Sequence, residues 1–353
     1  MKRLVLTGGG TAGHVTPHLA LIPHLEAEGY ELHYIGTSDG IERELIPARI
    51  PYYAIAAGKL RRYFDWRNLT DPFRVLKGIG QAWRILRKVR PAAIFSKGGF
   101  VTVPVAAAGW MLGIPVLLHE SDYSPGLANR ISLRFARRIC LTFPESLQYV
   151  PKDKAVVTGT PIREELRHGS RDAGLKLCRF SPARPTLLVM GGSLGSQIIN
   201  QVIRDALPEL IEDFQVIHLV GRGNLDHTIA NRAYCQFEYA AEELPHLFAA
   251  ADYVVSRAGA NSIFELCTLR KPNLLIPLSR QASRGDQILN AQSFAKQGFS
   301  VVLEEENLSP ESLLAALSEL QRSRDKYIQA MAQSKLGDGT TNVVREIKAL
   351  AER

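Results

Sequence analysis

The chain has few cysteines, no Asp-x-Asp pair and no long uninterrupted apolar run. Its four cysteines lie far apart in the 353 residues without a Cys-x-x-Cys pair, which argues against a disulfide framework or a zinc site and fits a reducing cytoplasm. Because no Asp-x-Asp pair is present, a metal held by two such aspartates is not expected. We expect neither a metal nor a cofactor.

The longest apolar stretch, residues 100–118, is interrupted by two prolines and two glycines. This pattern predicts a helix over 103–112 and a strand over 116–118 instead of a membrane span. The apolar run at the start of the sequence is short and turns into glycines, so no signal peptide is expected.

The net charge is +8 and the sequence pI is about 9.3. Such a balance favours an anionic partner, which could be nucleic acid, an anionic membrane surface or a phosphorylated substrate. No recognised nucleic-acid-binding motif accompanies the charge, so we expect no nucleic acid partner. With 46% hydrophobic and 22% charged residues, the chain has the composition of a globular protein long enough for two domains.

Strands alternate with helical patterns along the chain, which predicts an α/β fold with parallel sheets. The second half restarts as the first half begins, with a strand followed by a glycine loop, here 186–190 and 191–196. The polar segment between the halves predicts an interdomain linker. We therefore expect an N-terminal domain over 1–163, a linker over 164–184, a C-terminal domain over 185–338 and a last helix within 339–353 that could pack back on the first domain.

The stretch Ser256-Arg257-Ala258-Gly259-Ala260-Asn261-Ser262-Ile263-Phe264-Glu265 organises the second half. A buried strand over 249–255 leads into a turn and a helix expected to open near Ser262. Free N–H groups there favour a pyrophosphate, and Glu265 in the first turn could accept bonds from both ribose hydroxyls. The alternative is that Ser262 and Glu265 form a capping box, which needs no ligand.

The glycine loop Gly8-x-Gly10-x-x-Gly13 after the first strand matches the dinucleotide fingerprint, with Asp39 near the end of the second strand. A nicotinamide-dependent oxidoreductase is therefore one hypothesis. His14 continues the loop where the cofactor phosphates would need a close backbone. It could be a general base or an ordinary surface histidine near a helix start.

Two further polar segments follow predicted strands of the first half. Ser96-Lys97-Gly98-Gly99-Phe100 offers N–H groups and a cation for an acceptor phosphate, or is an ordinary strand-to-helix turn. His119-Glu120-Ser121-Asp122 could orient a sugar or assist a base, or could cap the helix near 126–129.

Residues 59–90 mix cations with large aromatics, and Trp110-Met111 could extend the same apolar patch. This composition suits an anionic membrane surface. The alternative is a helix with an aromatic core face and a solvated charged face.

The motifs together resemble the MurG family, the peripheral membrane N-acetylglucosaminyltransferases of peptidoglycan synthesis. The resemblance spans nearly the whole chain. It rests on Gly8-Gly9-Gly10-Thr11-Ala12-Gly13-His14-Val15, Lys97-Gly98-Gly99-Phe100, His119-Glu120, Gly126-Leu127-Ala128-Asn129, Gly159-Thr160-Pro161-Ile162-Arg163, Gly191-Gly192-Ser193, Arg257-Ala258-Gly259-Ala260, Glu265, Asp286-Gln287 and Asn290.

The resemblance implies a GT-B fold of two Rossmann-like domains that face one another across a cleft. It implies an inverting transfer of GlcNAc from UDP-GlcNAc to the MurNAc 4-hydroxyl of lipid I, undecaprenyl-pyrophosphoryl-MurNAc-pentapeptide, which gives lipid II at the cytoplasmic face of the cell membrane.

By the same resemblance, the site residues fall into three groups. His14 and Glu120 would be catalytic. The donor would be bound by Thr11, Ala12, Gly13, Arg163, Ser193, Ala241, Ala260, Asn261, Glu265, Asp286 and Gln287. The acceptor would be bound by Lys97, Gly98, Gly99, His119 and Asn129.

The sequence departs from the family pattern at four positions. Many members carry Gly at Ala12, Gln-Asn at Ser121-Asp122 and Asn at Thr160. These departures leave a variant acceptor peptide or donor loop open. Besides the transferase and the nicotinamide enzyme, a nucleotide-sugar sensor or a membrane-bound scaffold is a third hypothesis.

Overall fold

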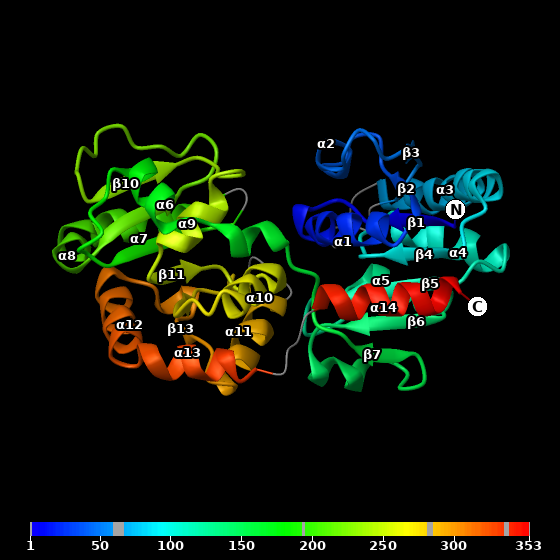
Figure 1. Cartoon of the computed structure of the whole chain (residues 1–353). Coiled ribbons are helices and arrows are strands. Elements are labelled where there is room, and N and C mark those ends of the chain that lie inside the picture. Colours follow the sequence, from blue (N-terminus) through cyan, green and yellow to red (C-terminus); the bar gives the residue numbers. More distant parts are fainter. Residues whose placement is uncertain (1, 59–66, 193–194, 281–284, 335–338, 353) are drawn as a thin grey trace. The chain divides into compact units, whose positions relative to one another are not determined.

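The computed structural model describes residues 2–58, 67–192, 195–280, 285–334 and 339–352. The chain divides into two compact units, drawn in Figure 1. Unit 1 comprises Met1–Arg163 and Leu336–Arg353, and unit 2 comprises Glu164–Lys335.

Unit 1 contains a parallel sheet of seven strands in the order β3-β2-β1-β4-β5-β6-β7. Its strands are nearly continuous apolar runs because both faces of a parallel sheet are covered. The strands are β1 (Arg3–Thr7), β2 (Glu31–Gly36), β3 (Tyr52–Ala54), β4 (Ala93–Ser96), β5 (Val116–Glu120), β6 (Arg138–Leu141) and β7 (Ala155–Val157).

Successive residues of β1 point to opposite faces of this sheet. Leu4 and Leu6 join one core cluster and Val5 joins the other. The helical segments of unit 1 are η1 (Ala12–His14), α1 (Thr16–Ala27), α2 (Glu42–Leu45), α3 (Arg67–Val89), α4 (Thr102–Met111), α5 (Leu127–Ser132), η2 (Pro144–Tyr149) and α14 (Gly339–Ala351).

Unit 2 contains a parallel sheet of six strands in the order β10-β9-β8-β11-β12-β13. The strands are β8 (Thr186–Met190), β9 (Gln215–Leu219), β10 (Tyr234–Phe237), β11 (Tyr253–Ser256), β12 (Asn273–Leu275) and β13 (Val301–Val302). The helical segments are η3 (Glu164–His168), α6 (Arg171–Cys178), α7 (Gln197–Asp205), α8 (Leu207–Asp213), α9 (Leu244–Ala250), α10 (Ala260–Thr268), α11 (Asp286–Lys296), η4 (Glu305–Asn307), α12 (Pro310–Arg322) and α13 (Arg324–Ala332).

The segment 164–184, expected to be a linker, lies within unit 2. Its helix α6 packs against α9, and Gly174 allows the contact, because a methyl group there would lie 2.1 Å from the carbonyl oxygen of His246. Ser170 caps α6 by accepting a hydrogen bond from the Ala173 N–H at 3.2 Å. The polar composition of this segment therefore belongs to a capped surface helix.

The last helix, α14, belongs to unit 1, where it contacts α1 and β4 (Figure 1). Val343, Ile347 and Leu350 are buried in the same core cluster as Leu4 and Leu6. The Thr340 hydroxyl accepts a hydrogen bond from the Ile162 N–H at 3.1 Å. This bond holds the start of α14 beside the end of the Met1–Arg163 part of unit 1. In the part of the chain that the structure describes, no helix has the length and apolar character needed to cross a bilayer.

Candidate functional site

The glycine loop of unit 1 follows β1, and its backbone donates a hydrogen bond to a buried carboxylate. The Gly10 N–H donates to Glu42 Oε2 at 3.1 Å, and Gly10 has a positive φ of 87° that favours glycine. In a dinucleotide site, such an N–H would face the cofactor phosphates. Here it faces an internal anion, while Asp39 is exposed beyond β2. The loop geometry therefore disfavours the nicotinamide hypothesis.

His14 ends the short helix η1 and is half-buried. Its Nδ1 lies 3.2 Å from the Gly9 carbonyl oxygen and 3.0 Å from Thr11 Oγ1. A carbonyl oxygen only accepts, so Nδ1 carries the proton and the lone pair of the neutral ring is on Nε2. This tautomer is the one that a general base at Nε2 requires.

Lys97 lies in the loop after β4 and is only 2% exposed. Its Nζ donates to His119 Nδ1 at 2.7 Å and to Ser121 Oγ. Burial lowers the pKa of Lys97 to about 8, with nearby Glu120 acting in the opposite direction. The sequence predicts that this segment suits an acceptor phosphate or is an ordinary strand-to-helix turn. In the structure, Lys97 is buried below the loops, and its hydrogen bonds connect the end of β4 to the end of β5.

His119 is fully buried in β5, and its Nε2 donates to the Gly159 carbonyl oxygen at 2.9 Å. Burial, and then the Lys97 charge, hold the pKa of His119 well below its usual value. His119 is thus a neutral link between Lys97 and the segment after β7.

Glu120 ends β5, and its carboxylate is engaged by the loop that follows. Oε1 accepts the Asp122 N–H at 3.0 Å, and Oε2 accepts the Gly126 N–H and the Asn129 Nδ2 group, both at 2.9 Å. These three donors satisfy the carboxylate oxygens and shape the loop. We had predicted Glu120 to be catalytic beside His14, and these contacts support an orienting role for it.

Three of these loops meet around Gly98. A methyl group built on Gly98 would lie 3.4 Å from His14 Cδ2 and 3.4 Å from Asn129 Nδ2. One built on Gly99 would lie 2.2 Å from the Gly9 carbonyl oxygen, so only glycine permits this approach. The sequence-predicted residues of unit 1 therefore do gather at the carboxyl edge of its sheet.

In unit 2, α10 begins at Ala260, with Gly259 as the N-cap and without a side-chain hydrogen bond at the cap. The helix was expected to open near Ser262, and it begins at Ala260 because Gly259 already has the extended backbone of an N-cap residue. Ser262 lies inside the first turn, so it cannot form the capping box, and Glu265 lies in the second turn. Glu265 is 9% exposed.

Arg257, which the sequence analysis quoted without assigning it a role, connects several loops of unit 2. The guanidinium donates to Ser196 Oγ at 2.6 Å and to the Ile276 carbonyl oxygen at 3.2 Å, and it pairs with Glu305. It thereby joins the start of α7, the end of β12 and η4. The sequence signal that could have drawn attention to Arg257 is its position as a cation directly after a predicted strand.

The other predicted donor residues lie as follows. Asp286 and Gln287 open α11, and Gln287 Oε1 accepts the Leu278 N–H at 3.1 Å. The exposed Ala241 follows β10, and its N–H donates to Glu243 Oε2 at 3.2 Å. Arg163 belongs to unit 1, whereas Ser193 lies outside the described residues.

The basic aromatic patch was predicted over residues 59–90, of which 59–66 lie outside the described residues. The structure describes the backbone of this patch from residue 67 onward and its side chains from residue 72 onward. On α3, Phe73 and Leu76 are exposed, whereas Trp83 is half-buried beneath Arg87, whose guanidinium lies 4.7 Å from the ring centroid. Trp110 and Met111 are exposed at the end of α4. The face of α3 that carries Trp83 is thus partly a core face.

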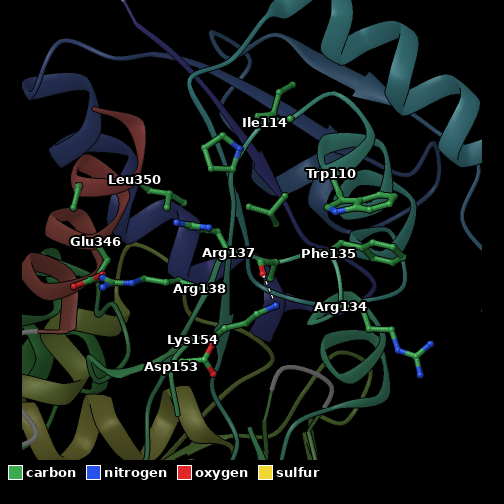
Figure 2. A pocket seen from close by; sticks show the side chains of 15 residues that line it. Trp110, Ile114, Arg134, Phe135, Arg137, Arg138, Asp153, Lys154, Glu346 and Leu350 are labelled. Atoms are coloured by element: carbon green, nitrogen blue, oxygen red, sulfur yellow. Dashed lines mark hydrogen bonds and ion pairs between the residues drawn. The ribbon is translucent and has the colours of Figure 1, made fainter. Parts of the chain in front are cut away.

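Figure 2 shows a pocket of about 750 Å³ at the opposite edge of the unit 1 sheet, where β5 and β6 begin. Trp110 and Phe135 form one wall with ring centroids 5.8 Å apart, and Arg134 and Arg137 are both exposed. Arg138 pairs with Glu346 of α14 in the same pocket. Within the described residues, no group of three or more His, Cys, Asp or Glu side chains could hold a metal ion.

Comparison with known proteins identifies the family. Residues 4–141 match the glycosyltransferase family 28 N-terminal domain, and residues 186–348 match its C-terminal domain. A relative from Clostridium kluyveri is 55% identical over 350 residues, covering 99% of both chains, and is named UDP-N-acetylglucosamine--N-acetylmuramyl-(pentapeptide) pyrophosphoryl-undecaprenol N-acetylglucosamine transferase. The chain belongs to this transferase family.

A second member of the family, from Clostridium tetani, is 55% identical over 345 residues, which is 97% of this chain and 96% of the relative. The crystal structure of Acinetobacter baumannii MurG is 26% identical with a TM-score of 0.77, covering 99% of this chain and 100% of that chain. The predicted family and the predicted GT-B fold with two parallel-sheet domains are both confirmed, and the chain is a glycosyltransferase.

Proposed function

We propose that the protein transfers N-acetylglucosamine from UDP-GlcNAc to the MurNAc 4-hydroxyl of lipid I, with inversion at the anomeric carbon, to give lipid II for peptidoglycan synthesis. The observation that carries this proposal is the 55% identity over 99% of the chain to a transferase named for these substrates. The loop that holds His14 with a protonated Nδ1 supports it.

His14 is the general base in the proposed reaction. Its Nε2 accepts the proton of the acceptor hydroxyl while that oxygen attacks the anomeric carbon of the donor. The bond from the anomeric carbon to the pyrophosphate oxygen breaks, and UDP leaves with the electron pair. The hydrogen bond from Nδ1 to the Gly9 carbonyl supports this role, because it keeps the Nε2 lone pair available in the neutral ring. Glu120 orients the segment that leads from β5 to Asn129 of α5, as its hydrogen bonds support.

Unit 2 binds the donor. Glu265 accepts hydrogen bonds from the uridine ribose, and the uracil is recognised by backbone groups near Ala241. The N-terminus of α10 at Ala260 and Asn261 meets the pyrophosphate, a role supported by the absence of a capping side chain at Gly259. Asp286 and Gln287 contact the sugar. The family resemblance also assigns Arg163, Ser193, Thr11, Ala12 and Gly13 to donor binding, and of these Ser193 lies outside the described residues.

Unit 1 binds the acceptor around Gly98, Gly99 and Asn129. Lys97 and His119 hold these segments from beneath, as their buried hydrogen bonds support.

Release of UDP tests the proposal. The purified chain, UDP-GlcNAc and a short-chain lipid I analogue should yield UDP and a disaccharide-bearing lipid at equal rates. Binding of UDP without turnover would indicate a nucleotide-sugar sensor, and quenching of NADH fluorescence without binding of UDP would favour a nicotinamide enzyme.

The protein acts from the cytoplasmic face of the cell membrane as a peripheral protein. Support comes from Phe73, Leu76, Trp110 and Met111, which are large, apolar and exposed on α3 and α4. Exposed cations accompany them, namely Arg74, Lys77, Arg84, Arg87 and Lys88 on α3 and Arg134 and Arg137 at the pocket of Figure 2. Each such cation contributes about 1 kcal/mol near an anionic leaflet.

Sedimentation with vesicles tests this part of the proposal. The protein should sediment with phosphatidylglycerol vesicles and less with phosphatidylcholine vesicles, and the double variant Phe73→Ser, Leu76→Ser should reduce sedimentation. The matched control is Leu177→Ser, because Leu177 is 45% exposed on α6 in unit 2. An equal loss in the control, or no loss in either variant, would remove α3 from the membrane contact.

A further inference from the structure

Glu42 is a fully buried carboxylate outside every motif discussed above. It opens α2, and both of its oxygens accept hydrogen bonds. Oε1 accepts the Thr37 N–H at 3.0 Å and the Thr37 hydroxyl at 2.6 Å, whereas Oε2 accepts the Gly10 N–H at 3.1 Å. A buried carboxylate needs such donors, because an uncompensated charge in the interior is costly.

The glycines around Glu42 make room for its carboxylate. A methyl group on Gly9 would lie 2.5 Å from Glu42 Cδ, and one on Gly40 would lie 2.2 Å from Glu42 Oε1. The carboxylate therefore lies in a space that the missing side chains of the glycine loop and of the turn before α2 leave open.

The peptide group between Gly9 and Gly10 connects this carboxylate to His14. The N–H of that group donates to Glu42 Oε2, and the C=O of the same group accepts from His14 Nδ1 at 3.2 Å. Hydrogen bonds in series polarise one another, so the anion increases the negative charge on the Gly9 carbonyl oxygen. A more negative oxygen binds Nδ1–H more strongly and favours the imidazolium that forms when Nε2 takes a proton.

The geometry points to Glu42 as a positioning residue for His14, acting through the Gly9–Gly10 peptide group. In hydrolases with a Ser-His-Asp triad, an aspartate contacts the histidine directly, holds its tautomer and stabilises the imidazolium. Here a backbone amide stands between the carboxylate and the ring. This inference rests on the proposed role of His14 as the base.

Other titratable groups lie around the same loop. They are His18 on α1, which interacts electrostatically with His14, Tyr34 on β2, whose hydroxyl donates to the Gly8 carbonyl oxygen at 2.7 Å, Lys97 after β4 and Glu120 on β5. None of them bonds to the Gly9–Gly10 peptide group in the contacts that the described residues make.

Glu42→Gln tests the inference. A glutamine has one acceptor oxygen, whereas Thr37 and Gly10 require acceptors on both oxygens of Glu42. We expect kcat to fall by about 10- to 100-fold, within the range of general-base effects, while the affinity for UDP is unchanged. The acidic limb of the kcat/KM profile should move to lower pH because the imidazolium loses stabilisation. Glu44→Gln, on the exposed side of α2, should leave both quantities unchanged.

A double-mutant cycle separates positioning from a general structural effect. In a His14→Ala background, Glu42→Gln should reduce the residual rate by less than about twofold, because residues acting as a unit are not additive. A second full loss in that background would overturn the positioning role and leave His14 as the base. Wild-type turnover in His14→Ala alone would overturn the proposed base and the inference together.

A measurement on the wild-type protein tests the inference without any variant. Nitrogen-15 NMR of the His14 ring should show the proton on Nδ1 and the lone pair on Nε2 in the neutral form. A neutral ring protonated on Nε2 would overturn the inference.

Discussion

The two units share a parallel sheet with a glycine loop after an inner strand, yet the buried charged side chain that contacts this loop is a carboxylate in unit 1 and a guanidinium in unit 2. Unit 1 buries the carboxylate of Glu42, which takes up the Gly10 N–H. Unit 2 buries the guanidinium of Arg257, which is held by carbonyl oxygens, Ser196 and Glu305.

This difference matches the proposed division of labour. In unit 1 the Gly10 N–H already donates to Glu42, so the proposed contribution of the loop is the His14 imidazole. A buried cation and an uncapped helix start in unit 2 favour a bound pyrophosphate. The buried charges therefore distinguish two halves that the topology alone makes alike.

The largest expected effect is on turnover, through unit 1. His14→Ala should lower kcat by about 10²- to 10⁴-fold, because the acceptor hydroxyl loses its base. The affinity for UDP, measured by calorimetry, should stay at the wild-type value because the donor residues of unit 2 are intact. A variant that lost donor affinity while keeping kcat would reverse the assignment of the two units.

The next effect is on stability, through unit 2. Arg257→Met leaves Glu305, whose side chain is only 12% exposed, without its cation, and we expect a loss of about 3–5 kcal/mol in the free energy of unfolding. Adding Glu305→Gln should restore part of that loss in urea unfolding. The control is Arg324→Met, which removes an exposed pair with Asp325 and should change stability by less than about 1 kcal/mol. Equal losses in both single variants would show that Arg257 is an ordinary surface cation.

The buried cation of unit 1, Lys97, should make the stability of the protein depend on pH. The folded pKa of Lys97 is about 8 and its ordinary value is 10.5, so between these values the unfolded chain binds more protons than the folded one. Stability should therefore rise with pH across this window, by roughly 3 kcal/mol from this group. The difference in unfolding free energy between wild type and Lys97→Met should show this rise, and a flat difference would contradict the buried placement of the ammonium.

The sequence predicted much of the fold, because its signals are local. The apolar runs that became β1, β8 and β11 and the glycines that follow strands are visible within a few residues. The segment 164–184, predicted to be a linker, falls within unit 2, where part of it forms α6.

The charged groups beneath the loops could not be predicted in the same way. Glu42 lies 32 residues from Gly10, and Arg257 lies 61 residues from Ser196, so neither contact leaves a pattern in either segment. Lys97 and Glu120 were identified as site residues, but only the folded chain shows that their polar atoms bond to neighbouring loops. Sequence patterns predicted the candidate site residues, and only the long-range packing shows which side chains support these loops.

The smallest expected effect is on UDP binding, and it tests the proposed difference between the two units most directly. Glu265→Ala should weaken UDP binding by about 10- to 100-fold, the range for hydrogen bonds to a charged group, and kcat at saturating donor should change far less because His14 is intact. Glu209→Ala, an exposed carboxylate on α8, is the matched control. A loss of stability in Glu265→Ala with unchanged UDP affinity would mean that the carboxylate only supports α10. That outcome would leave the helix start without its carboxylate partner and would move the ribose contact to another residue of unit 2.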